Sequence, residues 1–323
     1  MKTNARFIAL AVSAILLAGV LAGCTQTGMP AASEEGAIID IEFDMVPLAA
    51  GAPTAVLRLP TAPGTQVAKN AKAEIDHSNT RDGYVMIRFL QSTSKSLAVQ
   101  VIGPSSVTYT YTLRADGRHE VFPLSDGNGR YTIRVLEQVE GSRFSLAIST
   151  EINVTLADEF APFLRPNQYV NFNRDSRVVA KASELATGVD GMPARVSAIY
   201  NFVIQNISYD RELARTVQSG YIPNVDAVLE RGKGICFDYA ALMTAMLRSL
   251  GIPTRLVIGY AGDVYHAWID VHSEETGWIN SVIFFDGSNW HLMDPTFAST
   301  ANQSAEVMRF IGDGKNYSAR YLY

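Results

Sequence analysis

The stretch that decides the fold of this chain is Gly234-Ile235-Cys236-Phe237-Asp238-Tyr239-Ala240, with the apolar run that continues from it to Leu250. Alanine, leucine and methionine occupy most of the run, so a helix formed here has almost no polar face and must be buried. Its end is marked by a C-terminal cation, a stop and a helix breaker: Arg248, Gly251 and Pro253. The sequence therefore predicts a buried helix that begins beside Cys236.

Strand-like segments follow this helix, and helix-like segments precede it. Residues 255–260, 264–272, 282–285 and 290–293 read as strands, and a turn over 286–289 joins the last two. Upstream, apolar stripes at helical spacing predict a helix from Val178 to Ala186, a second behind Pro193 and a third capped by Asn224. A buried helix packed on an antiparallel sheet gives an α+β fold.

Cys236 stands where a thiol can be activated for attack on a carbonyl carbon. The thiolate is the nucleophile, and a helix N-terminus favours that anion through its partial positive charge and free N–H groups. The Cys236 N–H can also point at an oxyanion, and the glycines at 232 and 234 would let a substrate backbone come close. Alone, such a cysteine is usually only a small core residue.

A base and an orienting carboxylate follow in order. Strand alternation puts His266, Trp268, Asp270 and His272 on one face of the strand, and the opposite face is more apolar and seeks the core. We therefore expect His266 to look outward into a cleft lined by Trp268. Asp294, directly before Pro295, can accept the second ring N–H of His266 and fix its tautomer.

The N-terminal half has a different hydrophobic pattern. From 37 to 156 the dominant period is two, in strands such as 39–45, 84–90, 97–102 and 107–113 separated by glycine-rich turns. Short strands at this spacing predict an all-β, sandwich-like domain. Nothing in it assembles into a catalytic set, so we interpret it as a spacer or a binding module. A connector with a helix, 157–192, leads to the catalytic domain at 193–323.

The first 23 residues read as a secretory signal, with Lys2 and Arg6 ahead of an apolar core. Leu21-Ala22-Gly23-Cys24 then resembles the lipobox of bacterial lipoproteins, which implies that lipid is attached to Cys24 and the chain cleaved before it. The alternative is a simple signal cleaved after a small residue. Residues 24–36 would form a tether. We expect a lipid-anchored protein on the extracytoplasmic face of the cell membrane.

Composition narrows the class of protein. Hydrophobic residues make up 47% and charged residues 18%, as in folded globular proteins. A net charge of -5 without long basic runs gives no footprint for nucleic acid. The two cysteines are Cys24 and Cys236, so lipid on Cys24 would leave Cys236 as a free thiol in an oxidising compartment.

Four ordered motifs resemble the transglutaminase-like superfamily. They are 234–240, 247–255 with Gly259-Tyr260, His266-Ala267-Trp268 and Asp294-Pro295-Thr296. The segment ending in Ile207-Ser208-Tyr209-Asp210 resembles the one that precedes the family's core. The resemblance implies a papain-like, transglutaminase-like domain in which Cys236, His266 and Asp294 form a triad. Gly234, Trp268 and Tyr209 are the residues expected to line the substrate cleft.

The implied reaction is attack on a carboxamide or peptide carbonyl through a thioester. Water as acceptor would make the protein a cysteine peptidase or amidase acting on a protein or peptide at the cell surface. A lysine amine as acceptor would make it a protein-glutamine gamma-glutamyltransferase, and an insertion carrying Glu274, Glu275 and 282–293 could reshape that side of the site. The alternative from another class is a non-catalytic surface binding module.

No cofactor or metal is expected. His266, His272, His291 and Asp294 match no compact ligand spacing, and there is no acidic loop of the EF-hand type.

Overall fold

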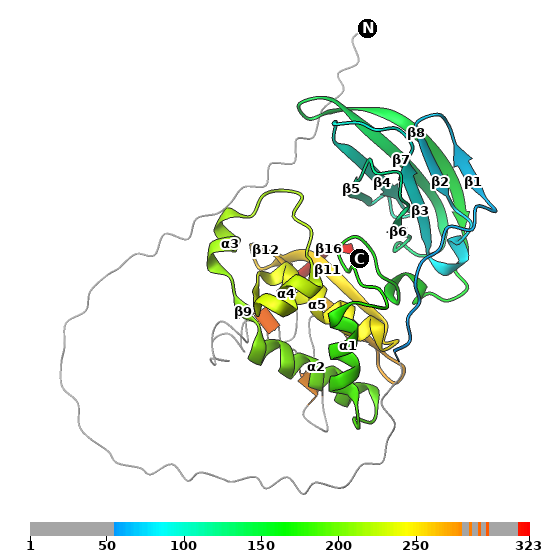
Figure 1. The fold of residues 1–323 in the computed structure, drawn as a ribbon. Coiled ribbons are helices and arrows are strands. Elements are labelled where there is room, and N and C mark those ends of the chain that lie inside the picture. Colours follow the sequence, from blue (N-terminus) through cyan, green and yellow to red (C-terminus); the bar gives the residue numbers. More distant parts are fainter. Residues whose placement is uncertain (1–54, 280–283, 286–289, 292–294, 297–315) are drawn as a thin grey trace, which may run out of the picture. The chain divides into compact units, whose positions relative to one another are not determined.

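The computed structural model describes residues 55–279, 284–285, 290–291, 295–296 and 316–323 (Figure 1). All of these described residues belong to one compact unit. The predicted strand at 39–45, the signal segment and Cys24 lie outside the described residues, as does Asp294.

The first part of the described chain is all β, as predicted. Two four-stranded antiparallel sheets make it up. In spatial order, the strands of the first are β1 (Val67–Lys69), β2 (Ala73–Asp76), β3 (Tyr84–Phe89) and β6 (Glu120–Pro123), with the short 3-10 helix η1 (Thr80–Asp82) before β3. Those of the second are β5 (Thr108–Leu113), β4 (Leu97–Ile102), β7 (Gly129–Glu140) and β8 (Arg143–Val154).

The core of this part follows the period of two in the sequence. Tyr109, Tyr111 and Leu113 of β5 are buried, and the threonines between them are exposed. Val99 and Val101 of β4 join Ile75 and Ile87 of the other sheet in the same core. Apolar faces of both sheets are thereby removed from water, which is the main stabilising term of a sandwich.

In the described part of the chain, four α-helices precede the Cys236 helix, and three of them were predicted. They are α1 (Arg177–Ala186), α2 (Met192–Asn206), α3 (Arg211–Thr216) and α4 (Val225–Arg231), and the 3-10 turn η2 (Ala161–Phe163) lies ahead of them. Asn224 caps α4 as expected, since its side chain accepts from Ala227 N–H at 3.0 Å. The unpredicted α3 begins at a similar cap, Asp210, which accepts from Leu213 N–H at 2.9 Å.

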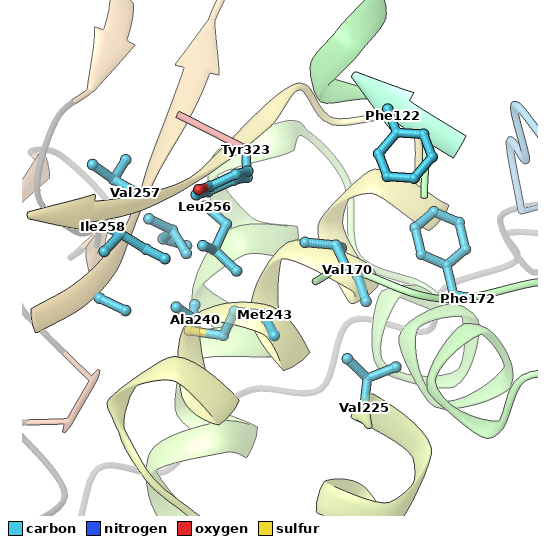
Figure 2. Close-up of a cluster of buried hydrophobic side chains, with 14 of the residues drawn as sticks. Phe122, Val170, Phe172, Val225, Ala240, Met243, Leu256, Val257, Ile258 and Tyr323 are labelled. Carbon is cyan, nitrogen blue, oxygen red and sulfur yellow. The ribbon is translucent and has the colours of Figure 1, made fainter. Parts of the chain in front are cut away.

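The helix α5 (Cys236–Ser249) is the centre of the second part. Its residues from Asp238 to Ser249 are all buried, which confirms the prediction made from its unbroken apolar run. The helices α1, α2 and α4 contact it, and the strands β11 (Thr254–Ala261) and β12 (Val264–Ser273) pack against it. Figure 2 shows Ala240 and Met243 of α5 beside Leu256, Val257 and Ile258 of β11.

The sheet beneath α5 is antiparallel, as expected. Its order is β13 (Gly277–Ile279), β12, β11 and β16 (Tyr317–Leu322). The predicted hairpin is present in its described residues as β14 (Phe284–Phe285) paired with β15 (Trp290–His291). Two strands of the sheet, β13 and β16, were not predicted, because each is short or only partly buried.

Arg248 differs from its expected place. Instead of serving an exposed helix end it is fully buried, and its guanidinium donates to the backbone oxygens of Thr254, Arg165 and Tyr323 at 2.9, 2.7 and 2.6 Å. Burial lowers the pKa of Arg248 to about 9. The side chain therefore ties α5 to the start of β11, to the connector and to the last strand.

Candidate active site

Cys236 is the first residue of α5 and is partly exposed. The residue before it, Ile235, has extended backbone angles, φ −94° and ψ 176°, so the chain turns sharply into the helix at the thiol. This confirms that Cys236 begins a buried helix. An anion at its Sγ would meet the positive end of the helix dipole.

The start of α5 leaves backbone donors available near the thiol. The N–H groups of a helix's first turn have no partner within the helix, and the Ile235 side chain has no acceptor atom to cap them. Ile235 N–H itself donates to the Asp238 carboxylate at 2.9 Å. The remaining first-turn amides, including that of Cys236, can therefore serve an oxyanion.

Asp238 is a site residue whose role sequence reasoning missed. It is fully buried, and besides Ile235 N–H its carboxylate accepts from the Tyr221 hydroxyl at 2.8 Å. Burial raises the pKa of Asp238, while burial and the nearby carboxylate raise the pKa of Tyr221 to about 12. An acid at the third helical position is a known capping signal, but it is normally read with Ser or Thr at the N-cap, where this chain has Ile.

Gly234 and Tyr209, two of the expected cleft residues, are register partners beside the thiol. They pair in the short parallel ladder of β9 (Ser208–Tyr209) and β10 (Lys233–Gly234). Gly234 is buried, and a Cβ placed on it would lie 2.5 Å from Cβ of Asp238. The need for glycine here comes from the close approach of Asp238, whereas the sequence suggested the approach of a substrate.

His266 lies in β12 opposite Gly259 of β11. Its ring is 6.2 Å from that of Trp268 and nearly parallel to it, so the two share a face as predicted. The expectation of an outward-looking histidine was wrong, because His266 is only 5% exposed and Trp268 3%. The unpredicted strand β16 contributes to this cover: the Tyr317 ring lies 5.1 Å from that of Trp268 and 6.3 Å from that of His266, centroid to centroid.

The close packing of this face also requires Gly259. A Cβ on Gly259 would lie 2.1 Å from the Ser318 carbonyl oxygen and 2.8 Å from the Trp268 ring. The glycine therefore allows β16 and the indole to approach β11 together.

Electrostatics relate the thiol to the tip of the β11–β12 hairpin. Burial raises the pKa of Tyr265, the neighbour of His266, and the charges of Tyr321 and Cys236 contribute to the same direction. Tyr265 is 54% exposed and forms an edge-to-face pair with Tyr260 at 5.6 Å.

His272, the other histidine on that strand face, has aromatic neighbours. Its ring lies 4.1 Å from that of Phe160 and 5.3 Å from that of Trp278. No group of three or more His, Cys, Asp or Glu side chains that could hold a metal occurs among the described residues. Over the same residues, no helix is long and apolar enough to cross a membrane.

Comparison with known proteins gives a family match for the second part of the chain. The model of the transglutaminase-like superfamily matches residues 179–281. YebA, an uncharacterised protein of Bacillus subtilis (strain 168), is 30% identical over 123 residues, which cover 32% of this chain and 17% of YebA. ML0607, an uncharacterised protein of Mycobacterium leprae (strain TN), is 26% identical over 257 residues, which cover 75% of this chain and 80% of ML0607. The chain thus spans less than a fifth of the first relative's length.

Solved structures give more distant similarities. A candidate cysteine protease from Cytophaga hutchinsonii is 18% identical, with a TM-score of 0.34 over 66% of this chain and 78% of that one. Red sea bream transglutaminase is 13% identical, with a TM-score of 0.30 over 68% of this chain and 48% of that one. The matched segment 179–281 contains both Cys236 and His266. Residues 179–281 of this chain form a domain of the transglutaminase-like superfamily.

Proposed function

We propose that this protein is a thiol enzyme that attacks a carboxamide or peptide carbonyl through Cys236. One observation carries the proposal: the partly exposed thiol is the first residue of a buried helix that packs against β12, the strand of His266. Both residues lie inside the segment that matches the transglutaminase-like superfamily. A thiol at a helix start, a histidine and free backbone donors are the groups that such a reaction needs.

The proposed reaction runs through a thioester. His266 takes the thiol proton, and Cys236 Sγ bonds to the carbonyl carbon while first-turn amides of α5 stabilise the oxyanion. The carbon–nitrogen bond then breaks, and imidazolium at His266 gives its proton to the leaving amine or ammonia. Water attacks the thioester and loses a proton to His266, and the carbon–sulfur bond breaks to return the thiol and a carboxylic acid.

Asp294 is proposed to orient His266. It lies outside the described residues, and the support for its role is its position in the sequence, after the cysteine and histidine and directly before Pro295. A carboxylate that accepts one ring N–H holds the other ring nitrogen ready to take the thiol proton.

Hydrolysis is the favoured outcome because Cys236 is partly exposed, so that water can reach a thioester formed there. The chain would then be a cysteine peptidase or amidase. Incubation with a glutamine-containing peptide and a labelled primary amine separates the outcomes. Ammonia or cleavage without incorporated label supports hydrolysis, incorporation supports a transferase, and no turnover with an unreactive thiol supports a binding module.

Three variants test the assignment of residues. Cys236→Ala and His266→Ala should each lower turnover by at least about a thousandfold, the usual range for members of such a set. His272→Ala is the matched control, because His272 lies on the same strand and the same face as His266. Equal losses in His266→Ala and His272→Ala would show damage to the sheet and remove the case for His266 as the base.

We also propose that the enzyme works outside the cytoplasm, held to the cell membrane by lipid on Cys24, with proteins or peptides of the cell surface as substrates. The support is the lipobox-like Leu21-Ala22-Gly23-Cys24 behind an apolar, positively charged leader. Labelling of cells with an alkyne analogue of palmitate should mark the wild type and leave Cys24→Ser unmarked. Equal labelling of the two chains would contradict lipid attachment at Cys24.

A further inference from the structure

Tyr169 lies in the connector, where three parts of the chain meet. Its ring centroid is 5.7 Å from that of Tyr111 in β5, and the two rings are nearly parallel. The Tyr169 ring also lies 4.8 Å from the ring of Tyr323, which directly follows β16. It is 5.4 Å from the ring of Phe237, the residue after Cys236 in α5. One side chain therefore contacts the β part, the sheet of the second part and the start of the helix that carries the thiol.

Hydrogen bonds fix the same segment of the connector to β5. Thr112 N–H donates to Gln168 Oε1 at 3.2 Å, and Gln168 Nε2 donates to the Thr112 carbonyl oxygen at 2.8 Å. Because β5 is an edge strand of its sheet, the Gln168 amide occupies backbone groups that a further strand would otherwise bind. The Tyr169 hydroxyl donates to the Thr110 carbonyl oxygen at 3.4 Å. The backbone on both sides of the Tyr169 ring is thereby held against the β part.

Further aromatic contacts join β5 to the end of the chain. The Tyr109 ring lies 5.7 Å from that of Tyr321 and 5.5 Å from that of Tyr323, both edge to face. Tyr111 and Tyr323 form a third such pair at 5.7 Å. Tyr109, Tyr111 and Tyr323 are buried, and they belong to the same hydrophobic core as Ala240 of α5. The β part thus shares a core with α5 and is in a position to restrain it.

The start of α5 is the part of the helix that most needs such a restraint. Cys236 and Phe237 are partly exposed, whereas the residues from Asp238 to Ser249 are all buried. A helix end with few buried contacts frays more easily than the middle of the helix. Tyr169 supplies a ring contact to Phe237 at this end. Because a misplacement of about 1 Å can cost about a hundredfold in rate, this contact bears directly on the neighbouring thiol.

We propose that Tyr169 is a positioning residue for the thiol: its ring holds Phe237, and with it Cys236, in place against the β part of the chain. The inference rests on the proposed function, because the alignment that Tyr169 maintains is that of Cys236 with its base. The ring carries this role, since three ring contacts converge on it and its hydroxyl makes one long hydrogen bond. The β part would then set the reactivity of the thiol through β5 and Tyr169.

The rate of alkylation of Cys236 by iodoacetamide at neutral pH tests the proposal. The parent is the full chain with Cys24→Ser, in which Cys236 is the only thiol. Tyr169→Ala should react at least about fivefold more slowly than the parent, whereas Tyr169→Phe, which keeps the ring, should stay within about twofold of it. Tyr169→Leu keeps apolar volume without the ring, should also be slowed, and serves if Tyr169→Ala does not fold.

A double-variant cycle separates positioning from a general loss of stability. Phe237→Ala should slow alkylation at least about fivefold, because it removes the contact from the other side. A chain that carries both Tyr169→Ala and Phe237→Ala should react within about twofold of Phe237→Ala alone, since Tyr169 acts through Phe237. Effects that multiply in the double variant would overturn the proposal, because they would show two independent routes to the thiol.

Tyr84→Ala is the matched control. Tyr84 is a buried tyrosine of β3, in the other sheet of the β part, and its hydroxyl accepts from Thr61 N–H at 3.1 Å. This variant should lose stability and still react at the parent's rate under conditions in which it is folded. Equal slowing in Tyr84→Ala and Tyr169→Ala would overturn the proposal, because the loss would then follow stability alone.

His266→Ala, measured in the same series, distinguishes this inference from the proposed function. Parent rates in Tyr169→Ala and Tyr169→Leu beside a slow His266→Ala would overturn the positioning role and leave the proposed base in place. A slow Tyr169→Ala beside a His266→Ala that reacts as the parent does would support the restraint of the thiol and contradict His266 as its base. Parent rates in all of these variants would overturn both.

Discussion

The Tyr221 hydroxyl donates a 2.8 Å hydrogen bond to the carboxylate of Asp238, two residues beyond Cys236 in the first turn of α5. The same carboxylate accepts from Ile235 N–H at 2.9 Å. The buried carboxylate of Asp238 therefore connects the segment before α4 with Ile235, the residue that directly precedes Cys236. The position of Asp238 predicts that substitutions at Tyr221 and Asp238 change the reactivity of the Cys236 thiol, although both leave Cys236 itself in place.

Tyr221→Phe removes the donor and leaves the ring. A hydrogen bond to a charged group is worth about 1.5–3 kcal/mol, so we expect a loss of stability of that order in denaturant unfolding. The alkylation rate of Cys236 should also change, because the start of α5 loses one of its restraints. Tyr265→Phe, at a side chain that is 54% exposed, is the control for the measurement of stability alone. Identical stabilities of the two variants would contradict a role for the Tyr221 hydrogen bond.

Asp238→Asn tests the electrostatics of the same group. Burial raises the pKa of Asp238, so the folded protein holds this proton to higher pH than the unfolded chain does. The wild type should therefore lose stability from this group as pH rises from about 3.8, the usual pKa of Asp, through the raised folded value. Melting temperatures between pH 4 and 7 should shift in favour of the asparagine variant as pH rises. A constant difference would show that Asp238 does not titrate as described.

Glu74→Gln should show the opposite dependence of stability on pH. Hydrogen bonding from Arg88, against the effect of burial and with help from Lys69 and His119, lowers the pKa of Glu74 from 4.5 to about 2. The stability contributed by Glu74 is present above pH 4.5 and is lost as pH falls through about 2. The melting temperature of the wild type should exceed that of the variant at pH 5, with a gap that narrows towards pH 2. A gap that widens in acid would contradict this assignment.

Gly234→Ala tests the contact that makes glycine necessary beside the thiol. The added Cβ would lie 2.5 Å from Cβ of Asp238, so α5 or β10 must shift. We expect about 1–3 kcal/mol of lost stability, the usual cost of overpacking, together with a large fall in Cys236 reactivity. Gly64→Ala is the control for the reactivity of Cys236: its Cβ meets no neighbour within 4 Å, so its only cost is the backbone strain of a φ of +71°, in the β part of the chain. Wild-type reactivity in Gly234→Ala would show that the close contact does not position the thiol.

Local signals in the sequence predicted the elements that strong periodicity marks. The unbroken apolar run identified α5, and Asn224 and Pro193 identified the starts of α4 and α2. The strand β16 was missed because it lies at the edge of the sheet, half of its residues are exposed, and Tyr317–Leu322 carries no alternating apolar pattern. The expectation of an outward-looking His266 came from the more apolar opposite face of its strand, and it took no account of Tyr317, whose ring lies 6.3 Å from that of His266.

The sequence was sufficient to name residues of the candidate site, but it was less able to predict the contacts that these residues make. Cys236 at a helix start follows from residues that are adjacent in the chain, so local pattern suffices. The roles of Asp238 and Gly234 depend on a contact between them and on Tyr221, and no periodicity encodes such a contact. Arg248 was likewise read from its position near a helix end, whereas its three backbone acceptors come from segments far apart in the sequence.

The central claim is that His266 activates the thiol of Cys236, and the rate of alkylation of Cys236 by iodoacetamide as a function of pH tests it most directly. If His266 takes the thiol proton, the wild type and His272→Ala should react many times faster than His266→Ala at neutral pH. His266→Ala should show the slow reaction of an unassisted thiol, and its rate should approach that of the wild type only in strong base. Superimposable profiles for the wild type and His266→Ala would contradict the account.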